Sequence, residues 1–173
     1  PLIYAEKGLL QAYLTGPGTN EFSVKAGGAL NVVPDAAPYS GEKLSEVKEA
    51  LKKHEFDFEE QGEGIVVLGK SIHAKDAAQG VNAISRLAIA LSEVFDFGPI
   101  NFLGKLVQEN ATGEAVVGKT EDEQSGELTM NFASLEITPE QTKIGVDMRI
   151  PVTFKKDDLV AKLTKTAEKY GLT

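Results

Sequence analysis

The sequence has 173 residues, a formal net charge of −8 at pH 7 and 42% hydrophobic residues, enough for a domain with its own core. An acidic chain lacks the clustered lysine and arginine that bind phosphate backbones, so we expect no nucleic-acid partner. No apolar run approaches the roughly 18–20 residues that span a bilayer, which argues against a membrane protein. The absence of cysteine excludes disulfides and thiolate metal sites and favours a cytoplasmic location.

The first third of the chain predicts three strands and a helix. Alternating apolar and polar residues predict a strand over 8–15, closed by a Gly-Pro-Gly turn. Short strands are predicted over 22–26 and 29–33, the second ended by Pro34, which cannot donate to a strand ladder. After a loop rich in proline and glycine, an amphipathic pattern with glutamates first and lysines last predicts a helix over 42–53.

The remainder continues with strands and helices, which places the chain in the α+β class. The predicted elements are a hairpin of 56–60 and 64–69, helices over 79–94 and 156–170, and strands over 126–135 and 143–151. Residues 96–125 predict only a short apolar helix followed by a polar loop.

Two pairs of segments repeat along the chain. GLLQAYL in the first strand resembles GELTMNF, and ALNVVP resembles VDMRIP, at nearly the same spacing. The repeat predicts two related halves, 1–95 and 96–173, each with helices packed on one face of an antiparallel sheet. The chain starts PLIYAEKG without an initiator methionine, and we expect it to be part of a larger protein.

The residues for a complete catalytic centre are not found in the sequence. Zinc sites need three or four converging ligands, whereas this chain has two histidines, no cysteine and no HExxH motif. No nucleophile elbow or P-loop is present either. We expect His54, at a helix end, to bond a terminal carbonyl or face water, and the chain itself to bind no metal and hydrolyse nothing.

Three polar residues remain as candidates. His73 follows a strand and precedes a helix, where loops often present functional groups, although it could also bond a loop carbonyl. Asn31 lies in an apolar run in which asparagine is disfavoured, although it could face solvent or bond locally. Arg149 is predicted on the sheet face opposite Met148 and Ile150, where it could bind a ligand carboxylate through two hydrogen bonds.

These candidates lie in segments that resemble one family. GKSIHAKDAAQGVNAI resembles the lid, or dimerisation, segment of dinuclear zinc metallopeptidases related to aminoacylase, carnosinase and carboxypeptidase G. IYAEKGLLQAYLTGPG, AGGALNVVPDAAPYSGEKL and DMRIP resemble more narrowly the lid of PepV-type dipeptidases, also called Xaa-His dipeptidases. The similarity covers most of residues 3–170 in the expected order.

The resemblance implies that residues 1–173 form a lid inserted in a catalytic domain, which binds two Zn²⁺ ions and is absent from this chain. It implies two ferredoxin-like halves sharing antiparallel sheet, which imitate the dimer of related enzymes. His73 would contact the scissile carbonyl oxygen and the tetrahedral intermediate. Asn31 would donate an amide hydrogen bond in the substrate cleft, and Arg149 would bind the C-terminal carboxylate of the substrate.

We therefore expect the substrate-binding lid of a zinc-dependent dipeptidase, with a dipeptide and the catalytic domain of the same parent chain as partners. The second half looks incomplete after its last helix, which would leave a sheet edge that could pair with another copy. The alternatives are a stand-alone small-molecule-binding or dimerisation module with a ferredoxin-like fold, and a module that serves only for protein interaction.

Overall fold

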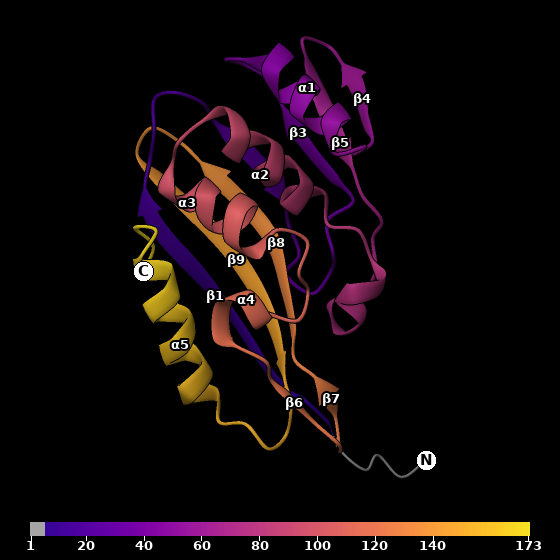
Figure 1. Ribbon diagram of the computed structural model, residues 1–173, viewed down its shortest axis with the longest axis vertical. Coiled ribbons are helices and arrows are strands. Elements are labelled where there is room, and N and C mark those ends of the chain that lie inside the picture. Colours follow the sequence, from indigo (N-terminus) through magenta and orange to yellow (C-terminus); the bar gives the residue numbers. More distant parts are fainter. Residues whose placement is uncertain (1–5) are drawn as a thin grey trace.

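Residues 6–173 are described by a computed structural model, which contains a four-stranded and a three-stranded antiparallel sheet and a small two-stranded ribbon (Figure 1). The start of the similar segment at residues 3–5 lies outside this range. The strands are β1 (Gly8–Pro17), β2 (Val24–Gly27), β3 (Ala36–Tyr39), β4 (Phe58–Gln61), β5 (Gly64–Leu68), β6 (Glu121–Asp122), β7 (Gly126–Glu127), β8 (Thr129–Ile137) and β9 (Gln141–Ile150). The helices are α1 (Leu44–Lys53), the 3₁₀ helix η1 (Ala74–Gln79), α2 (Ala83–Val94), α3 (Gly98–Asn101), the π-helix η2 (Phe102–Val107), α4 (Glu114–Val117) and α5 (Lys156–Glu168).

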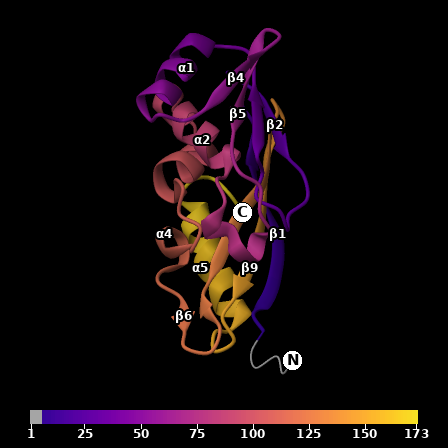
Figure 2. The same cartoon turned by 90° about the vertical axis from the view of Figure 1, so that its right-hand side faces the viewer.

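The helices α1, α2, α4 and α5 lie on one face of the sheets (Figure 2). The larger sheet has the order β1-β9-β8-β2, so two strands from the start of the chain flank two from its second half, and the smaller sheet has the order β3-β5-β4. This arrangement confirms the α+β class with antiparallel sheets. The division into halves at residue 95 stays a prediction. No helix in residues 6–173 is long and apolar enough to cross a bilayer.

Helix α2 is the centre of the core. Nine of its residues are buried, and it packs against α1, η2, β3, β5 and β8, so that it joins the two sheets. Gly104 of η2 lies so close to α2 that a Cβ there would come within 2.2 Å of the Ala88 carbonyl oxygen. Glycine at this position therefore permits close packing of the two helices.

Most of the predicted elements are confirmed, and three differences stand out. Residues 29–33 form turns with a single bridge at Val32 in place of a strand, because their carbonyl groups bond to a side chain and a loop elsewhere in the chain. The helix predicted over 79–94 begins at residue 83, because the Asn82 side chain accepts a hydrogen bond from Ser85 N and caps it there. The segment predicted as a loop after Pro34 contains β3, which pairs with β5 alone.

The β6–β7 ribbon is tied to the loop after β9 by Asp122. Its carboxylate accepts hydrogen bonds from the backbone and hydroxyl groups of both Ser125 and Thr153, at 2.6–3.0 Å. Burial acts to raise the pKa of the Asp122 carboxyl, but these four donors outweigh it and hold the pKa well below its usual value. The ionised form of Asp122 therefore stabilises the folded state.

Replacing Asp122 by asparagine tests this contribution. Since the pKa is depressed in the folded state, the stabilisation is present above the pKa of the unfolded chain, about 3.9, and is lost as the pH falls through the lower folded value. We expect Asp122→Asn to lower the free energy of unfolding at pH 7, with the difference from the wild type shrinking below about pH 4. Urea unfolding at several pH values measures it, with Glu123→Gln on the same exposed turn as control. A difference that does not change with pH would contradict the assignment.

Candidate functional site

His73 and Asn31 lie side by side at the edge of the larger sheet. His73 forms an antiparallel bridge with Val32, Ala74 N donates to the Asn31 carbonyl oxygen at 2.8 Å, and Val33 N donates to the Ile72 carbonyl oxygen at 2.9 Å. Both candidate side chains are exposed. The structure thus brings together two candidates that are 42 positions apart in the sequence.

The imidazole of His73 is held in one orientation by the helix that follows it. His73 is the N-cap of η1, and its Nδ1 atom accepts a hydrogen bond from Lys75 N at 3.1 Å. An Nδ1 that accepts a hydrogen bond carries no proton, so the neutral ring carries its proton on Nε2. Among the described residues, Nε2 has no hydrogen-bond partner. The ring therefore presents an N–H donor to solvent.

The loop that carries Asn31 is fastened to β8 by the side chain of Asn131. Asn131 is 2% exposed, and its Nδ2 donates to the carbonyl oxygens of Leu30 at 3.1 Å and Val32 at 3.0 Å. Asn82 Nδ2 donates to the Phe132 carbonyl oxygen at 2.8 Å and lies 3.4 Å from Asn131 Oδ1. These bonds fix the loop relative to the sheet and to the start of α2.

Arg149 lies on β9 and is paired with a buried carboxylate. Its Nε and Nη2 donate to Asp147 at 2.8 and 3.1 Å, and Gln11 Nε2 donates to the same carboxylate at 2.9 Å. Asp147 is fully buried, whereas the Arg149 side chain remains 19% exposed. A guanidinium has five N–H donors, so the edge formed by its two terminal nitrogens keeps donors for a ligand.

Among the described residues, Arg149 makes no direct hydrogen bond with His73 or Asn31. It shares a sheet face with Asn131, which holds the loop of Asn31. Asn131 is directly opposite Asp147 in the β8–β9 register. Side chains at paired positions and at i, i+2 point to the same face, so Asn131, Asp147 and Arg149 form one polar row. The row ends beneath the loop of Asn31. The sheet face of Arg149, which was predicted to be exposed, is therefore partly buried at this residue.

A lysine lies at the same end of the sheet. Lys7 directly precedes β1, whose Leu9 pairs with Arg149. Burial lowers the pKa of the Lys7 ammonium, while the carboxylates of Glu127, Asp122 and Asp76 act to raise it. Asp76, the last and smallest of these influences, belongs to η1, the helix after His73.

Three residues around the candidates were not predicted from the sequence. Asn131 and Asp147 are polar residues in the middle of long strands, and that position was the only available signal. Thr129 is opposite Arg149, is 9% exposed, and its Oγ1 has no hydrogen-bond partner in the described residues. Its hydroxyl group is thus a buried polar group without a partner, at the position paired with Arg149.

His54 has a structural role that differs from the one predicted. Its Nε2 lies 2.6 Å from Glu93 Oε1, and its ring stacks on Phe56 with 5.2 Å between the ring centres. It therefore ties the end of α1 to α2. Within residues 6–173, no group of three or more histidine, cysteine, aspartate and glutamate side chains could hold a metal ion.

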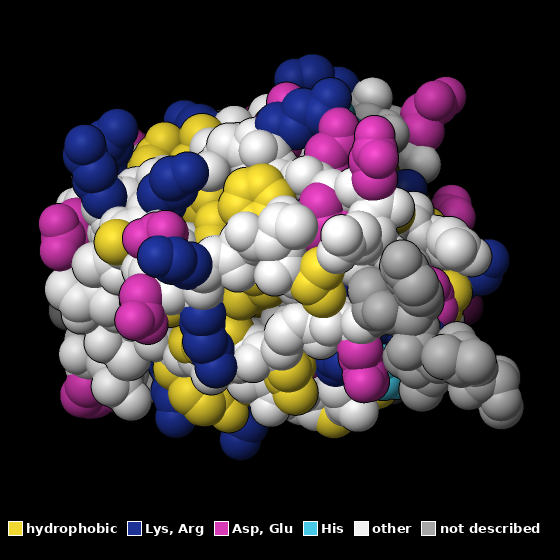
Figure 3. All heavy atoms as spheres, turned by 90° about the horizontal axis from the view of Figure 1, so that it is seen from below, with side chains coloured by type: hydrophobic (Ala, Val, Ile, Leu, Met, Phe, Trp, Pro, Cys, Tyr) yellow, Lys and Arg dark blue, Asp and Glu magenta, His cyan; other side chains and the backbone are white. Residues whose placement is uncertain are grey.

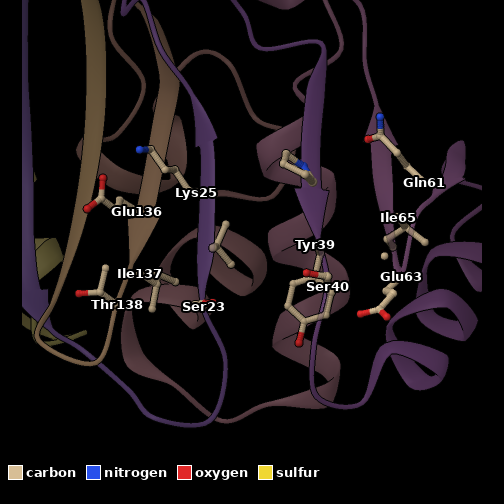
Figure 4. A pocket seen from close by; sticks show the side chains of 13 residues that line it. Ser23, Lys25, Tyr39, Ser40, Gln61, Glu63, Ile65, Glu136, Ile137 and Thr138 are labelled. Atoms are coloured by element: carbon tan, nitrogen blue, oxygen red, sulfur yellow. The ribbon is translucent and has the colours of Figure 1, made fainter.

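Among the hollows of the surface, one is lined in part by Val33, Asn82 and Asn131, close to the loop of Asn31. A groove of about 530 Å³, lined by both polar and apolar residues, lies between β2 and β3 (Figure 4). Its side chains include Ser23, Lys25, Ser40, Gln61, Glu63 and Glu136. Seen from below, basic and acidic side chains are mixed, with hydrophobic ones between them (Figure 3). That face shows no extended basic surface of the kind that binds nucleic acid.

The fold and the sequence define the class of the protein. The family model of the peptidase dimerisation domain, M20_dimer, matches residues 61–172, which is more than half of the chain. The chain belongs to this family. The resemblance to the lid or dimerisation domain of this peptidase family is thereby confirmed.

Two curated relatives carry dipeptidase names. The chain is 34% identical over 180 residues to "Putative dipeptidase YtjP" of Bacillus subtilis (strain 168), with 88% of this chain and 38% of that protein covered. It is 25% identical over 198 residues to "Putative dipeptidase SH1171" of Staphylococcus haemolyticus (strain JCSC1435), with 99% and 42% covered. The chain thus spans about two fifths of the length of these relatives.

The buried pair of Arg149 and Asp147 makes a prediction for stability. Arg149→Ala leaves a buried carboxylate without its counter-charge, so we expect a loss of about 3 kcal/mol. In the Arg149→Ala variant, Asp147→Ala should lower the free energy of unfolding by less than it does in the wild type. A double-mutant cycle measured by urea unfolding should give a coupling energy of about 1–3 kcal/mol between the two residues.

The surface pair of Arg86 and Glu109, 2.7 Å apart, is the control. Glu109→Ala should cost at most about 1 kcal/mol, because the Glu109 carboxylate is 44% exposed and water screens its ion pair. Equal losses for Arg149→Ala and Glu109→Ala, or an additive cycle, would show that the Arg149 pair is not a buried, coupled one.

Proposed function

We propose that this chain is the substrate-contacting lid of a zinc-dependent dipeptidase, in which His73 stabilises the oxyanion and Asn31 and Arg149 bind the substrate. The observation that carries the proposal is the hydrogen bond from Lys75 N to Nδ1 of His73, which leaves the N–H of this exposed ring on Nε2, in a segment paired with that of Asn31. A fixed N–H donor is the group that a developing oxyanion requires. The dipeptidase names of the relatives supply the reaction.

The roles of the three residues follow from their chemistry. Attack on a peptide carbonyl moves negative charge to its oxygen. The His73 Nε2–H would donate to that oxygen without a change of ring orientation, because the hydrogen bond from Lys75 N already holds the ring. Asn31, held in the same loop, would donate from its amide to the substrate. The terminal nitrogens of Arg149 would bind the C-terminal carboxylate, which favours short substrates with a free carboxyl end.

The metal belongs to another part of the parent protein in this proposal. The side chains described here do not form a metal site, so we assign the Zn²⁺ pair to a catalytic domain that closes against this one. When bound there, the metal pair would supply an activated water. The contribution of this chain is to orient the dipeptide and to donate hydrogen bonds. A cytoplasmic location stays a prediction.

Association through a sheet edge is the second candidate function, and the family description favours it. Strand β1 lies at the edge of the larger sheet, and within residues 6–173 the backbone pairing on its outer side is limited to two bonds between Thr15 and Thr173, at 2.8 and 3.0 Å. A free edge of this kind can pair with another strand. Light scattering over a range of concentrations tests self-association, and a constant monomer would exclude it.

His73→Ala in the full-length dipeptidase tests the oxyanion role. We expect kcat to fall about 100- to 1,000-fold with little change in KM, because the donor acts chiefly in the transition state. His54→Ala is the matched control, since the other histidine binds Glu93 and should leave kcat unchanged. An unchanged kcat in His73→Ala would remove this role.

Arg149→Lys tests carboxylate binding while keeping the charge next to Asp147. A lysine lacks the planar fork, so we expect KM for dipeptides to rise about tenfold or more with a smaller change in kcat. The wild-type enzyme should discriminate strongly against dipeptides with an amidated C-terminus, and the variant should discriminate less. If amidated and free dipeptides were hydrolysed equally well by the wild type, Arg149 would not bind the carboxylate.

A further inference from the structure

Three successive backbone carbonyl groups, those of Leu30, Asn31 and Val32, each accept a hydrogen bond. Asn131 Nδ2 donates to the oxygens of Leu30 and Val32, on either side of Asn31, and Ala74 N donates to the oxygen of Asn31 itself. Backbone carbonyls of a surface loop ordinarily bond to water, which leaves the loop mobile. Here both peptide planes that flank the Asn31–Val32 unit are fixed by one buried side chain.

The amide of Asn131 is itself fixed from behind. Its Oδ1 lies 3.4 Å from Asn82 Nδ2, and Asn82 also caps α2 through Ser85 N and binds the Phe132 carbonyl oxygen. Asn131 belongs to β8 and is 2% exposed, so it cannot turn toward water. The orientation of the loop is thereby set by the central sheet and by α2, the most buried helix of the core.

The same loop holds His73. Val33 N donates to the Ile72 oxygen, Ala74 N donates to the Asn31 oxygen, and these two bonds enclose the Val32–His73 bridge. A shift of the Asn31 loop therefore moves the backbone on both sides of His73. Displacing a catalytic donor by about 1 Å can cost about 100-fold in rate.

We propose that Asn131 is a positioning residue, which acts on the reaction through His73 and Asn31 without touching the substrate. The inference rests on the proposed function of those two residues. An amide is suited to this task, because one nitrogen carries two N–H donors and can hold two carbonyl oxygens at once. A hydroxyl group in its place can hold only one of them.

Asn131→Ser is the test variant, because a serine fits the strand and retains one donor. In the full-length enzyme we expect kcat to fall about 10- to 100-fold, with a smaller change in KM. In a His73→Ala background the same substitution should cost little more, because the group that it positions is already absent. Asn20→Ser, at an exposed turn, is the matched control and should leave kcat unchanged in both backgrounds.

Hydrogen exchange measured by mass spectrometry on this 173-residue chain gives a second, independent readout. In Asn131→Ser, peptides that contain the amides of Val33 and Ala74 should exchange about tenfold faster, while those of β9 and α2 keep their protection. Unchanged exchange at these amides, or equal losses of kcat with and without His73, would overturn the inference. If His73→Ala itself left kcat intact, the proposed function would fail, and the exchange result would still decide whether Asn131 positions the loop.

Discussion

Burial of α2 on nearly every side is the constraint on which the rest of the structure depends. The helix contacts elements of both sheets as well as α1 and η2, and small residues such as Ala83, Ala88 and Ala90 let its neighbours approach closely. A helix that is apolar around most of its circumference can be stable only inside a core. Its position therefore fixes where its N-cap, Asn82, meets β8, and this meeting point determines where the loops of Asn31 and His73 are held.

The sequence predicted those parts of the fold that local pattern controls. The amphipathic helices α1 and α5 and the alternating strand β1 appear where periodicity placed them. The run ALNVVP was predicted as a strand because its residue types suit one, yet side-chain bonds from Asn131, a hundred positions away, hold it as a loop. Strand β3 was not predicted, because proline is unfavourable in strands. Pro38 is tolerated in β3, because this edge strand pairs on one side only.

The candidate site follows the same division. His73, Asn31 and Arg149 could be selected from the sequence as polar residues at conspicuous positions and through their resemblance to a family. Their supports could not, because Asn131 and Asp147 acquire significance only from the β8–β9 register, which places them opposite each other on one face. Buried polar groups need partners, and each of these two residues has its own: Asn131 bonds to the Asn31 loop, and Asp147 bonds to Gln11 and Arg149. The register of β8 and β9 places the two sets next to each other on one sheet face.

The order of strands in the larger sheet has a consequence for how the chain acquires its shape. Gly8 pairs with Ile150 and Pro17 with Gln141, so β1 finds its neighbour only when nearly the whole chain is available. Contacts between such distant positions slow folding, because the intervening segment must first be closed into a loop. During synthesis β1 would remain unpaired until β9 is available, and an unpaired strand can pair wrongly with a strand of another molecule. The smaller sheet and α1, made of neighbouring segments, can form long before it.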